Sequence, residues 1–197
     1  MNACGCGDDL EHLERQTLWL LLVINGVMFV IEAAIGWIAE STGLLADSID
    51  MLADAIVYGM SLYAVGRSGA LQSRAASASG WVQIALGIGV VVEVLRRLLL
   101  GSDPVSILMI AIGTIALVAN VFCLMLLAKH RSGGIHMRAS WIFSTNDVIA
   151  NAGVIVSGCL VLLLGSRIPD LVVGALVSAI VIRGGWLILK EAARETE

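Results

Sequence analysis

Residues 17–39 read TLWLLLVINGVMFVIEAAIGWIA, an apolar stretch interrupted by one ionisable side chain, that of Glu32. A helix needs about 20 apolar residues to cross the hydrocarbon core of a bilayer, so this stretch is long enough to span a membrane. Five similar stretches follow, separated by short polar breaks. We place the six spans at residues 17–39, 44–65, 76–100, 105–128, 139–164 and 168–189.

The composition of the 197-residue chain supports the same fold class. Hydrophobic residues make up 58% of it and charged residues 14%, whereas about 25% of an ordinary soluble domain is charged. The 12 Lys and Arg residues are outnumbered by 16 Asp and Glu residues and form no basic face, which argues against nucleic-acid binding. The sequence therefore predicts an all-α, polytopic membrane protein with six transmembrane helices and no room for a soluble catalytic domain.

The positive charges predict how the spans are oriented. Eight Lys and Arg residues fall on one side of the predicted spans and three on the other, which places both termini in the cytoplasm. We expect a short cytoplasmic N-terminal segment (1–16), a transmembrane domain (17–190) and a short tail (191–197). The start of the chain has no basic region and no cleavage site, so we expect the first span to remain as an anchor in a multi-pass protein of the cell membrane, inner or plasma. Residues 66–80, rich in Ser, Ala and Gly, are expected to form a flexible loop.

Carboxylates inside the predicted spans are the most informative residues. Asp47, Asp50 and Asp54 in the second span are spaced i, i+3, i+7, which places them on one face of a helix. A carboxylate in hydrocarbon costs several kcal/mol and is retained mainly where it faces a cavity or a partner. The fifth span carries Asp147 at a matching depth. Because these two spans run antiparallel, we expect Asp50 to lie level with Asp147 and Asp54 level with Phe143.

A cluster of this kind has a predictable chemistry. Carboxylates that repel one another and lose their hydration must be neutralised by protons or by a cation. Their oxygens are hard ligands that suit Mg²⁺, Mn²⁺ and Fe²⁺ and are compatible with Zn²⁺ or Co²⁺. The sequence predicts a divalent metal site at Asp50, Asp54 and Asp147, with exchange of the metal for protons as the mechanism.

Other polar residues in the spans have alternative explanations. Asp47 is either a further ligand in an outer vestibule or a residue that favours a helix start. Glu32 and Glu93 are either interfacial or ion-paired groups or parts of a pathway. Three amides are expected to join helices by hydrogen bonds: Asn25, Asn120 and Asn151.

These motifs resemble those of a known family. The segment LLADSIDMLAD at residues 44–54 closely resembles the second-helix signature of the cation diffusion facilitators. The segment DVIANAGV at 147–154 is similar to their fifth-helix segment, and Pro169-Asp170 resembles the motif that opens their sixth helix. The resemblance extends over about residues 17–190. It implies a six-helix, usually homodimeric exporter of divalent transition metals, driven by proton antiport, with four ligands from helices two and five.

The resemblance also implies a ligand set with one member missing. Asp50, Asp54 and Asp147 match three family ligands, but the fourth position, commonly His or Asp, is Phe143, which has no lone pair to donate. The shell would be completed by water or by one of Ser144, Asn146 and Asn151. The expected cargo is a divalent ion of the Zn, Co, Cd, Fe or Mn class, with no tightly bound cofactor. The family's C-terminal metal-sensing domain is not expected, because the chain looks like a short form.

Two further features extend these expectations. Cys4, Cys6 and His12 carry thiol and imidazole ligands that suit zinc-like ions, and they are candidates for metal capture at the N-terminus. A single Cys-x-Cys is a weak signal compared with paired Cys motifs. A homodimer is expected partly from the resemblance and partly from small residues at helix-packing spacing, Gly174 with Ser178 and Gly153 with Ser157.

Two other functions compete with transport. Membrane-embedded CDP-alcohol phosphotransferases also have about six helices and a signature that begins Asp-x-x-Asp, which Asp47 and Asp50 fit. Such enzymes need Gly after the second Asp, where this chain has Met51, so we expect the chain not to be an enzyme. A non-transporting membrane partner with a degenerate metal site is the second alternative, because of Phe143.

Overall fold

The computed structural model describes the backbone of residues 5–64, 69–128 and 135–194, and the side chains of residues 15–60, 62–63, 74, 76–128 and 147–194. Within these ranges the chain forms six α-helices and no strand, which confirms the all-α expectation. The helices are α1 (Gly5–Ile38), α2 (Thr42–Ala64), α3 (Gly69–Leu100), α4 (Ser106–Ala128), α5 (Ile135–Leu164) and α6 (Ile168–Arg194).

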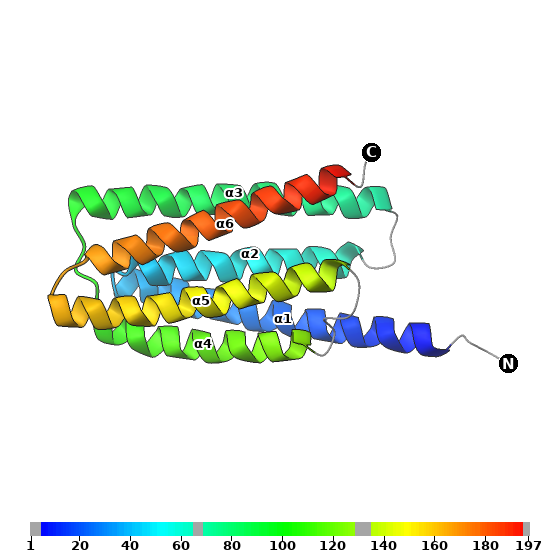
Figure 1. Ribbon diagram of the computed structural model, residues 1–197, viewed down its shortest axis with the longest axis horizontal. Helices are drawn as coiled ribbons and strands as arrows, with labels where there is room; N and C mark the ends of the chain where they lie inside the picture. The colour runs from blue at the N-terminus through cyan, green and yellow to red at the C-terminus, as the bar shows by residue number, and fades with distance from the viewer. Residues whose placement is uncertain (1–4, 65–68, 129–134, 195–197) are drawn as a thin grey trace.

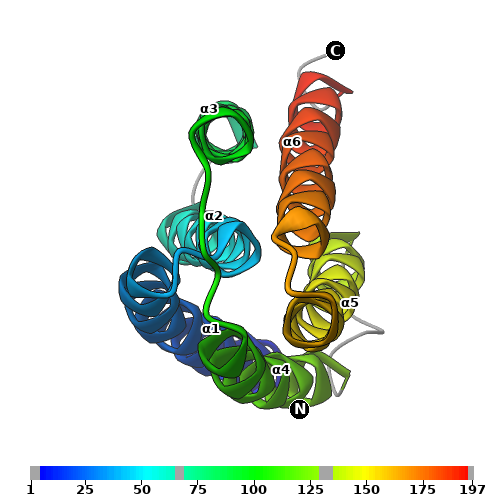
Figure 2. The same cartoon turned by 90° about the vertical axis from the view of Figure 1, so that its left-hand side faces the viewer.

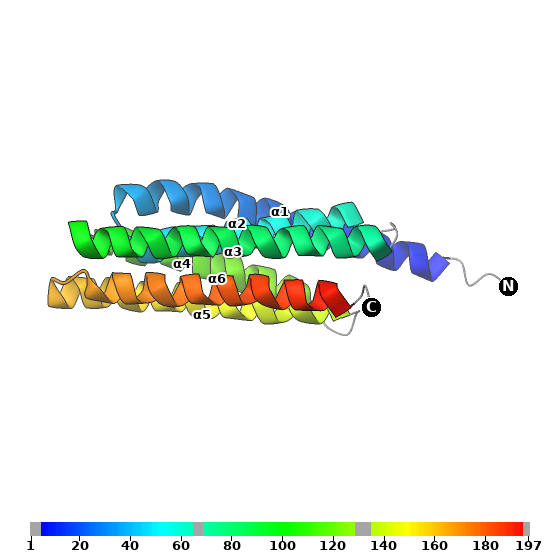
Figure 3. The same cartoon turned by 90° about the horizontal axis from the view of Figure 1, so that it is seen from above.

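The helices lie side by side along one axis, and successive helices run in opposite directions (Figure 1). Seen along this axis, α1, α2, α4 and α5 form one group, with α3 next to α2 and α6 next to α5 (Figure 2). The first turns of α1 extend beyond the other helices (Figure 3). The start of α1 and the end of α6 lie toward the same end of the bundle, which we call the inner end; the α1–α2, α3–α4 and α5–α6 connections form the outer end.

Five of the six helices described are long and apolar enough to cross a membrane by themselves. Their spans are Arg15–Ile38, Ala76–Leu100, Ser106–Ala128, Asp147–Leu164 and Ile168–Arg194. Helix α2 has comparable length but carries Asp47, Asp50 and Asp54, so its composition differs from that of the others. It packs between α1 and α3 and contacts α6, α5 and α4 as well. The other helices therefore shield its carboxylates from lipid.

Several helices extend further than the predicted spans. The prediction of a flexible loop at 66–80 is wrong for most of that stretch, because α3 begins at Gly69. Helix α1 begins at Gly5 and α5 at Ile135, so parts of the N-terminal segment and of the α4–α5 connection are also helical. Hydrophobicity marks the stretch that lies in lipid, whereas a helix can continue into water wherever its backbone hydrogen bonds persist.

Two glycines end helices at the outer face. Gly101 and Gly165 have φ angles of 96° and 58° and follow the last residues of α3 and α5. Their amides donate to the carbonyl groups of Arg97 and Val161 at 2.9 Å in each case. A left-handed residue after the last turn suits glycine, which has no Cβ. The predicted breaks at these two positions are confirmed.

Small residues bring helices close together inside the chain. The carbonyl oxygen of Gly80 lies 2.6 Å from the position that a Cβ on Gly185 would occupy, so α3 and α6 meet backbone to backbone. Gly174 abuts Thr42 at the start of α2, and Gly153 lies against Val173. Gly174 and Gly153 therefore make contacts within one chain, and the homodimer stays a prediction.

We predict that Gly185→Ala destabilises the bundle by about 1–3 kcal/mol, because its methyl group would overlap a backbone oxygen that cannot move aside. Gly89 is the matched control, since a Cβ there meets nothing within 4 Å. Gly89→Ala should be neutral or slightly stabilising, because Ala is the better helix former. Thermal unfolding midpoints in one detergent test this prediction, and equal midpoints for the two variants would contradict it.

Candidate metal centre

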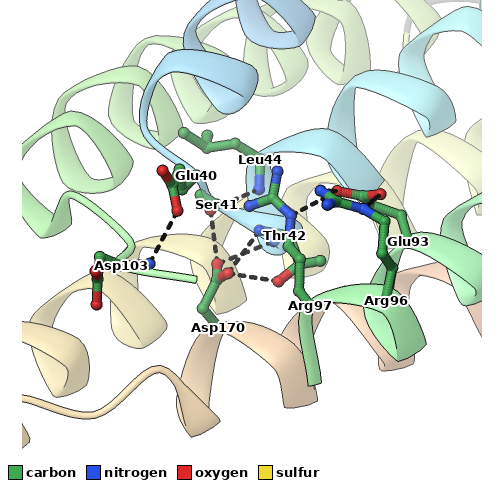
Figure 4. Close-up of polar contacts among 10 residues, drawn as sticks. Glu40, Ser41, Thr42, Leu44, Glu93, Arg96, Arg97, Asp103 and Asp170 are labelled. Carbon is green, nitrogen blue, oxygen red and sulfur yellow. Dashed lines mark hydrogen bonds and ion pairs between the residues drawn. The ribbon is translucent and has the colours of Figure 1, made fainter. Parts of the chain in front are cut away.

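The start of α2 is held by a carboxylate from α6. Asp170 Oδ1 accepts hydrogen bonds from Ser41 Oγ at 2.6 Å and from Gly43 N at 2.9 Å (Figure 4). Asp170 Oδ2 accepts from the backbone N and the Oγ1 of Thr42, both at 2.5 Å. The carboxylate is fully buried and also lies in the first turn of its own helix. The Asp170 carboxylate thus accepts hydrogen bonds from otherwise unpaired N–H groups of α2 and stabilises the N-terminus of α6.

Local sequence explains why α2 begins at this point. Ser41 precedes the helix, and its Oγ accepts a hydrogen bond from Leu44 N at 3.1 Å, the usual role of an N-cap residue. Glu40, just before it, has a φ of 49° and accepts a hydrogen bond from Asp103 N at the α3–α4 connection. With Ser41 and Asp170 capping the helix, Asp47 lies beyond its first turn. The reading of Asp47 as a helix-start residue is therefore wrong.

Three carboxyl groups meet between α2 and α5. The carboxyl group of Asp147 lies within hydrogen-bonding reach of Asp50 and of Asp54, which lie one turn apart on α2. A hydrogen bond between two carboxyl groups requires that one of them carry a proton. The expected convergence of these residues agrees with the geometry. Such close approach of the three groups requires a shared proton or a cation between them.

A phenol extends this cluster toward the inner end. Tyr58 OH lies 3.5 Å from Asp54 Oδ2, at the limit of a hydrogen bond, and the Tyr58 side chain is 2% exposed. Cys123 of α4 packs in the same buried cluster as Tyr58. The polar face of α2 therefore continues one turn past Asp54 and then meets apolar side chains.

A second carboxyl pair lies nearer the outer end. Glu32 of α1 and Asp47 of α2 lie against each other and are 0% and 1% exposed. Asp50, Asp54 and Asp147 keep slightly larger exposed fractions, 8%, 6% and 7%. The outer pair is thus the more completely sealed of the two groups.

Two surface hollows lie at the ends of the bundle. One hollow at the inner end is lined by Arg15, Gln16, Trp19 and Leu62. Another, at the outer end, is formed by the α3–α4 and α5–α6 connections and includes Ser102, Asp103, Pro104, Ser166 and Arg167.

The arrangement of the carboxyl groups bears on metal binding. Among the residues that the structure describes, no three His, Cys, Asp or Glu side chains are arranged to hold a metal ion together. An ion held by Asp50, Asp54 and Asp147 would therefore need these side chains to rearrange. A metal site at these residues remains a prediction.

Two further polar residues of the predicted spans, Glu93 and Asn151, have defined partners. Glu93 pairs with Arg96 at 2.7 Å and with Arg97 at 2.6 Å on the outer part of α3 (Figure 4). Of the two explanations left open for Glu93, the ion-paired one is therefore confirmed. Asn151 donates from Nδ2 to the carbonyl of Asp147 in its own helix, which does not match the expected bond between helices.

Several predicted residues cannot be assigned a position. The side chains of Phe143, Ser144 and Asn146 lie outside those that the structure describes, although their backbone belongs to α5. At the N-terminus, Cys4 lies outside the described residues, as do the side chains of Cys6 and His12. The auxiliary ligands and the N-terminal capture site both remain predictions.

Sequence reasoning missed some neighbours of the cluster. Tyr58 follows Asp54 by one helical turn, so extending the Asp47–Asp54 pattern would have found it. Asn120 is 1% exposed, and its Nδ2 has no hydrogen-bond partner. Gly158 packs on Met109, and this antiparallel register places Asn120 level with Asp147. No pattern within α4 alone indicates this, because α4 is otherwise apolar.

Fold and site together define a class of protein: a multi-pass membrane bundle with acidic side chains gathered inside it. A family model described as the cation efflux transmembrane domain matches residues 18–195. The chain belongs to this family of transporters, and the resemblance to cation diffusion facilitators is confirmed. Together with the five apolar helices, this membership makes it a multi-pass protein of the cell membrane.

Two curated relatives give a more distant comparison. The chain is similar to the zinc transporter ZitB of Yersinia pseudotuberculosis serotype I (strain IP32953) and to that of Yersinia pestis. Each is 27% identical over 107 residues, which covers 54% of this chain and 34% of the relative. The match therefore extends over about a third of the length of these relatives.

We predict that Asp170→Ala lowers the stability of the protein by about 2–4 kcal/mol, because it leaves buried N–H groups of α2 without an acceptor. Asp170→Asn, which keeps one accepting oxygen, should fall between this variant and the wild type. Glu40→Gln is the control at the same end of the bundle, since Gln keeps an acceptor for Asp103 N. Thermal unfolding midpoints in detergent measure the order, and an Asp170→Ala midpoint equal to the wild type would refute it.

Proposed function

We propose that the protein exports a divalent metal cation across the cell membrane and that Asp50, Asp54 and Asp147 bind the ion on its way. The observation that carries this proposal is the meeting of three carboxyl groups from two antiparallel helices inside the membrane. Membership of the cation efflux family supports the direction and the class of cargo. The ZitB relatives are named zinc transporters, which makes Zn²⁺ the first ion to test.

Proton antiport follows from the chemistry of the cluster. The carboxyl groups share protons when they contact one another, and a divalent cation binds their ionised forms. Protons and metal therefore compete for the same oxygens. A site that opens alternately to the two faces would take up metal from the cytoplasm and protons from outside, and the proton gradient would drive export.

The missing fourth ligand affects affinity more than mechanism. Phenylalanine at position 143 leaves three carboxylates, and water or a neighbouring amide or hydroxyl can complete the coordination of a hard or borderline ion. The ligand set is rich in oxygen, so Mn²⁺, Fe²⁺ and Co²⁺ belong in the test beside Zn²⁺.

We predict that Asp54→Asn abolishes export, because one ligand loses its charge at unchanged size. In proteoliposomes with an imposed proton gradient, flux of Zn²⁺, Co²⁺ or Mn²⁺ should fall about 100-fold or to background. Glu40→Gln, at the outer surface, is the matched control and should transport like the wild type. Equal flux in wild type and Asp54→Asn would rule out the proposed site. Turnover of added CDP-alcohol in the same vesicles would instead favour the enzyme reading.

Competition with protons gives a second prediction. Metal binding should weaken as the pH falls, by about tenfold per pH unit for each proton displaced. Titration calorimetry of the purified protein in two buffers with different ionisation enthalpies counts the protons released. An affinity that does not change with pH, together with equal heats in the two buffers, would contradict exchange of metal for protons.

A further inference from the structure

The carboxyl pair between α1 and α2 lacks the partners that a buried acid needs. Both carboxylate oxygens of Glu32 and Oδ2 of Asp47 are buried and receive no hydrogen bond from an N–H or O–H donor. The cationic partners identified in the described part of the chain, Arg96 and Arg97, both pair with Glu93. The pair is therefore a set of acceptors with no positive charge opposite it.

A fourth unpaired acceptor, Asn151 Oδ1 of α5, lies at the same depth in the bundle as Asp47. Ala46 and Ala150 belong to one packed cluster of buried residues, and Asp47 and Asn151 follow them in sequence. Asn151 is 0% exposed, its Nδ2 is used by the carbonyl of Asp147, and its Oδ1 has no partner. This layer lies about one helical turn outward of the central carboxylates.

The free-energy cost of burying these unpaired acceptors indicates that they serve a purpose. An unpaired buried carboxylate costs several kcal/mol, and replacing one by an apolar residue is often neutral or stabilising. An amide oxygen and two carboxylates are hard ligands suited to a divalent ion. The five buried carboxyl groups on α1, α2 and α5 also exceed the charge that one divalent ion neutralises.

We propose that Glu32 and Asp47, with the amide oxygen of Asn151, form a second binding station for the transported divalent cation, on the outer side of the central site. The station rests on the proposed function, because its cargo is the ion held by Asp50, Asp54 and Asp147. An ion leaving the central site moves about one helical turn, roughly 5 Å, to reach it. The station lies between the central site and the outer end where Asp170 caps α2.

The experiment counts bound ions in the purified full chain. Mn²⁺ is the probe, because it prefers oxygen ligands over the N-terminal thiols and its free form is quantified by its EPR signal. Titrations compare wild type, Glu32→Gln, Asp54→Asn and the surface control Glu40→Gln, and Co²⁺ serves as a second probe. We expect two ions in the wild type and in Glu40→Gln, and one in each of the other two variants.

Folding is checked in the same samples by thermal unfolding without metal. Glu32→Gln has nearly the same size and removes a buried charge, so its midpoint should equal or exceed that of the wild type. Asp47→Asn should show the same loss of one ion and provides a second variant of the station. Flux through Glu32→Gln in proteoliposomes should fall at least tenfold, because ions no longer leave the central site by this route.

The outcomes separate the two proposals. An unchanged ion count in Glu32→Gln would overturn the outer station and show that the pair only shares a proton, while the central site would stand. A loss of all binding in Glu32→Gln with an unchanged midpoint would also overturn it, because the two stations would not be separate. Absence of binding in wild type with both probes, or an unchanged count in Asp54→Asn, would count against the proposed function itself.

Discussion

The structure depends on the burial of carboxyl groups in a medium that does not solvate them. Five of them lie inside the bundle, on α1, α2 and α5, with exposed fractions of 8% or less. In hydrocarbon each must find a donor, a proton or a cation, since water cannot serve. This requirement explains why α2 packs among the other helices and why its acids face α1 and α5. Asp170 satisfies the same requirement differently, with four hydrogen bonds to the start of α2.

Much of the fold follows from the sequence, because the length of an apolar stretch predicts whether it crosses a bilayer and the distribution of positive charges predicts its orientation. The six helices and the breaks at Gly101 and Gly165 appear where the apolar stretches and glycines place them. The inner ends of α1, α3 and α5 were harder to predict, since a helix that leaves the lipid no longer needs apolar side chains. The stretch at 69–80, rich in Ser and Ala, shows this most clearly, because a flexible composition forms regular helix there.

The site was predictable in part. Helical spacing on α2 and the antiparallel relation to α5 were enough to bring Asp50, Asp54 and Asp147 together. The contact between Glu32 and Asp47 requires the register of α1 against α2, which depends on side-chain packing rather than on any motif. The position of Asn120 likewise depends on the α4–α5 register. Asp170 was visible only as part of a family motif, and its hydrogen bonds link residues far apart in the chain.

The shared cap at the outer end has a mechanical consequence. Asp170 lies in the first turn of α6 and accepts four hydrogen bonds from the residues that begin α2. These two helix ends therefore cannot slide past each other without breaking the four hydrogen bonds. The close backbone approach of Gly80 and Gly185 joins α3 to α6 in turn. Asp170 and this glycine contact therefore join the start of the acidic helix to α6 at the outer end, and α3 to α6 further along the bundle.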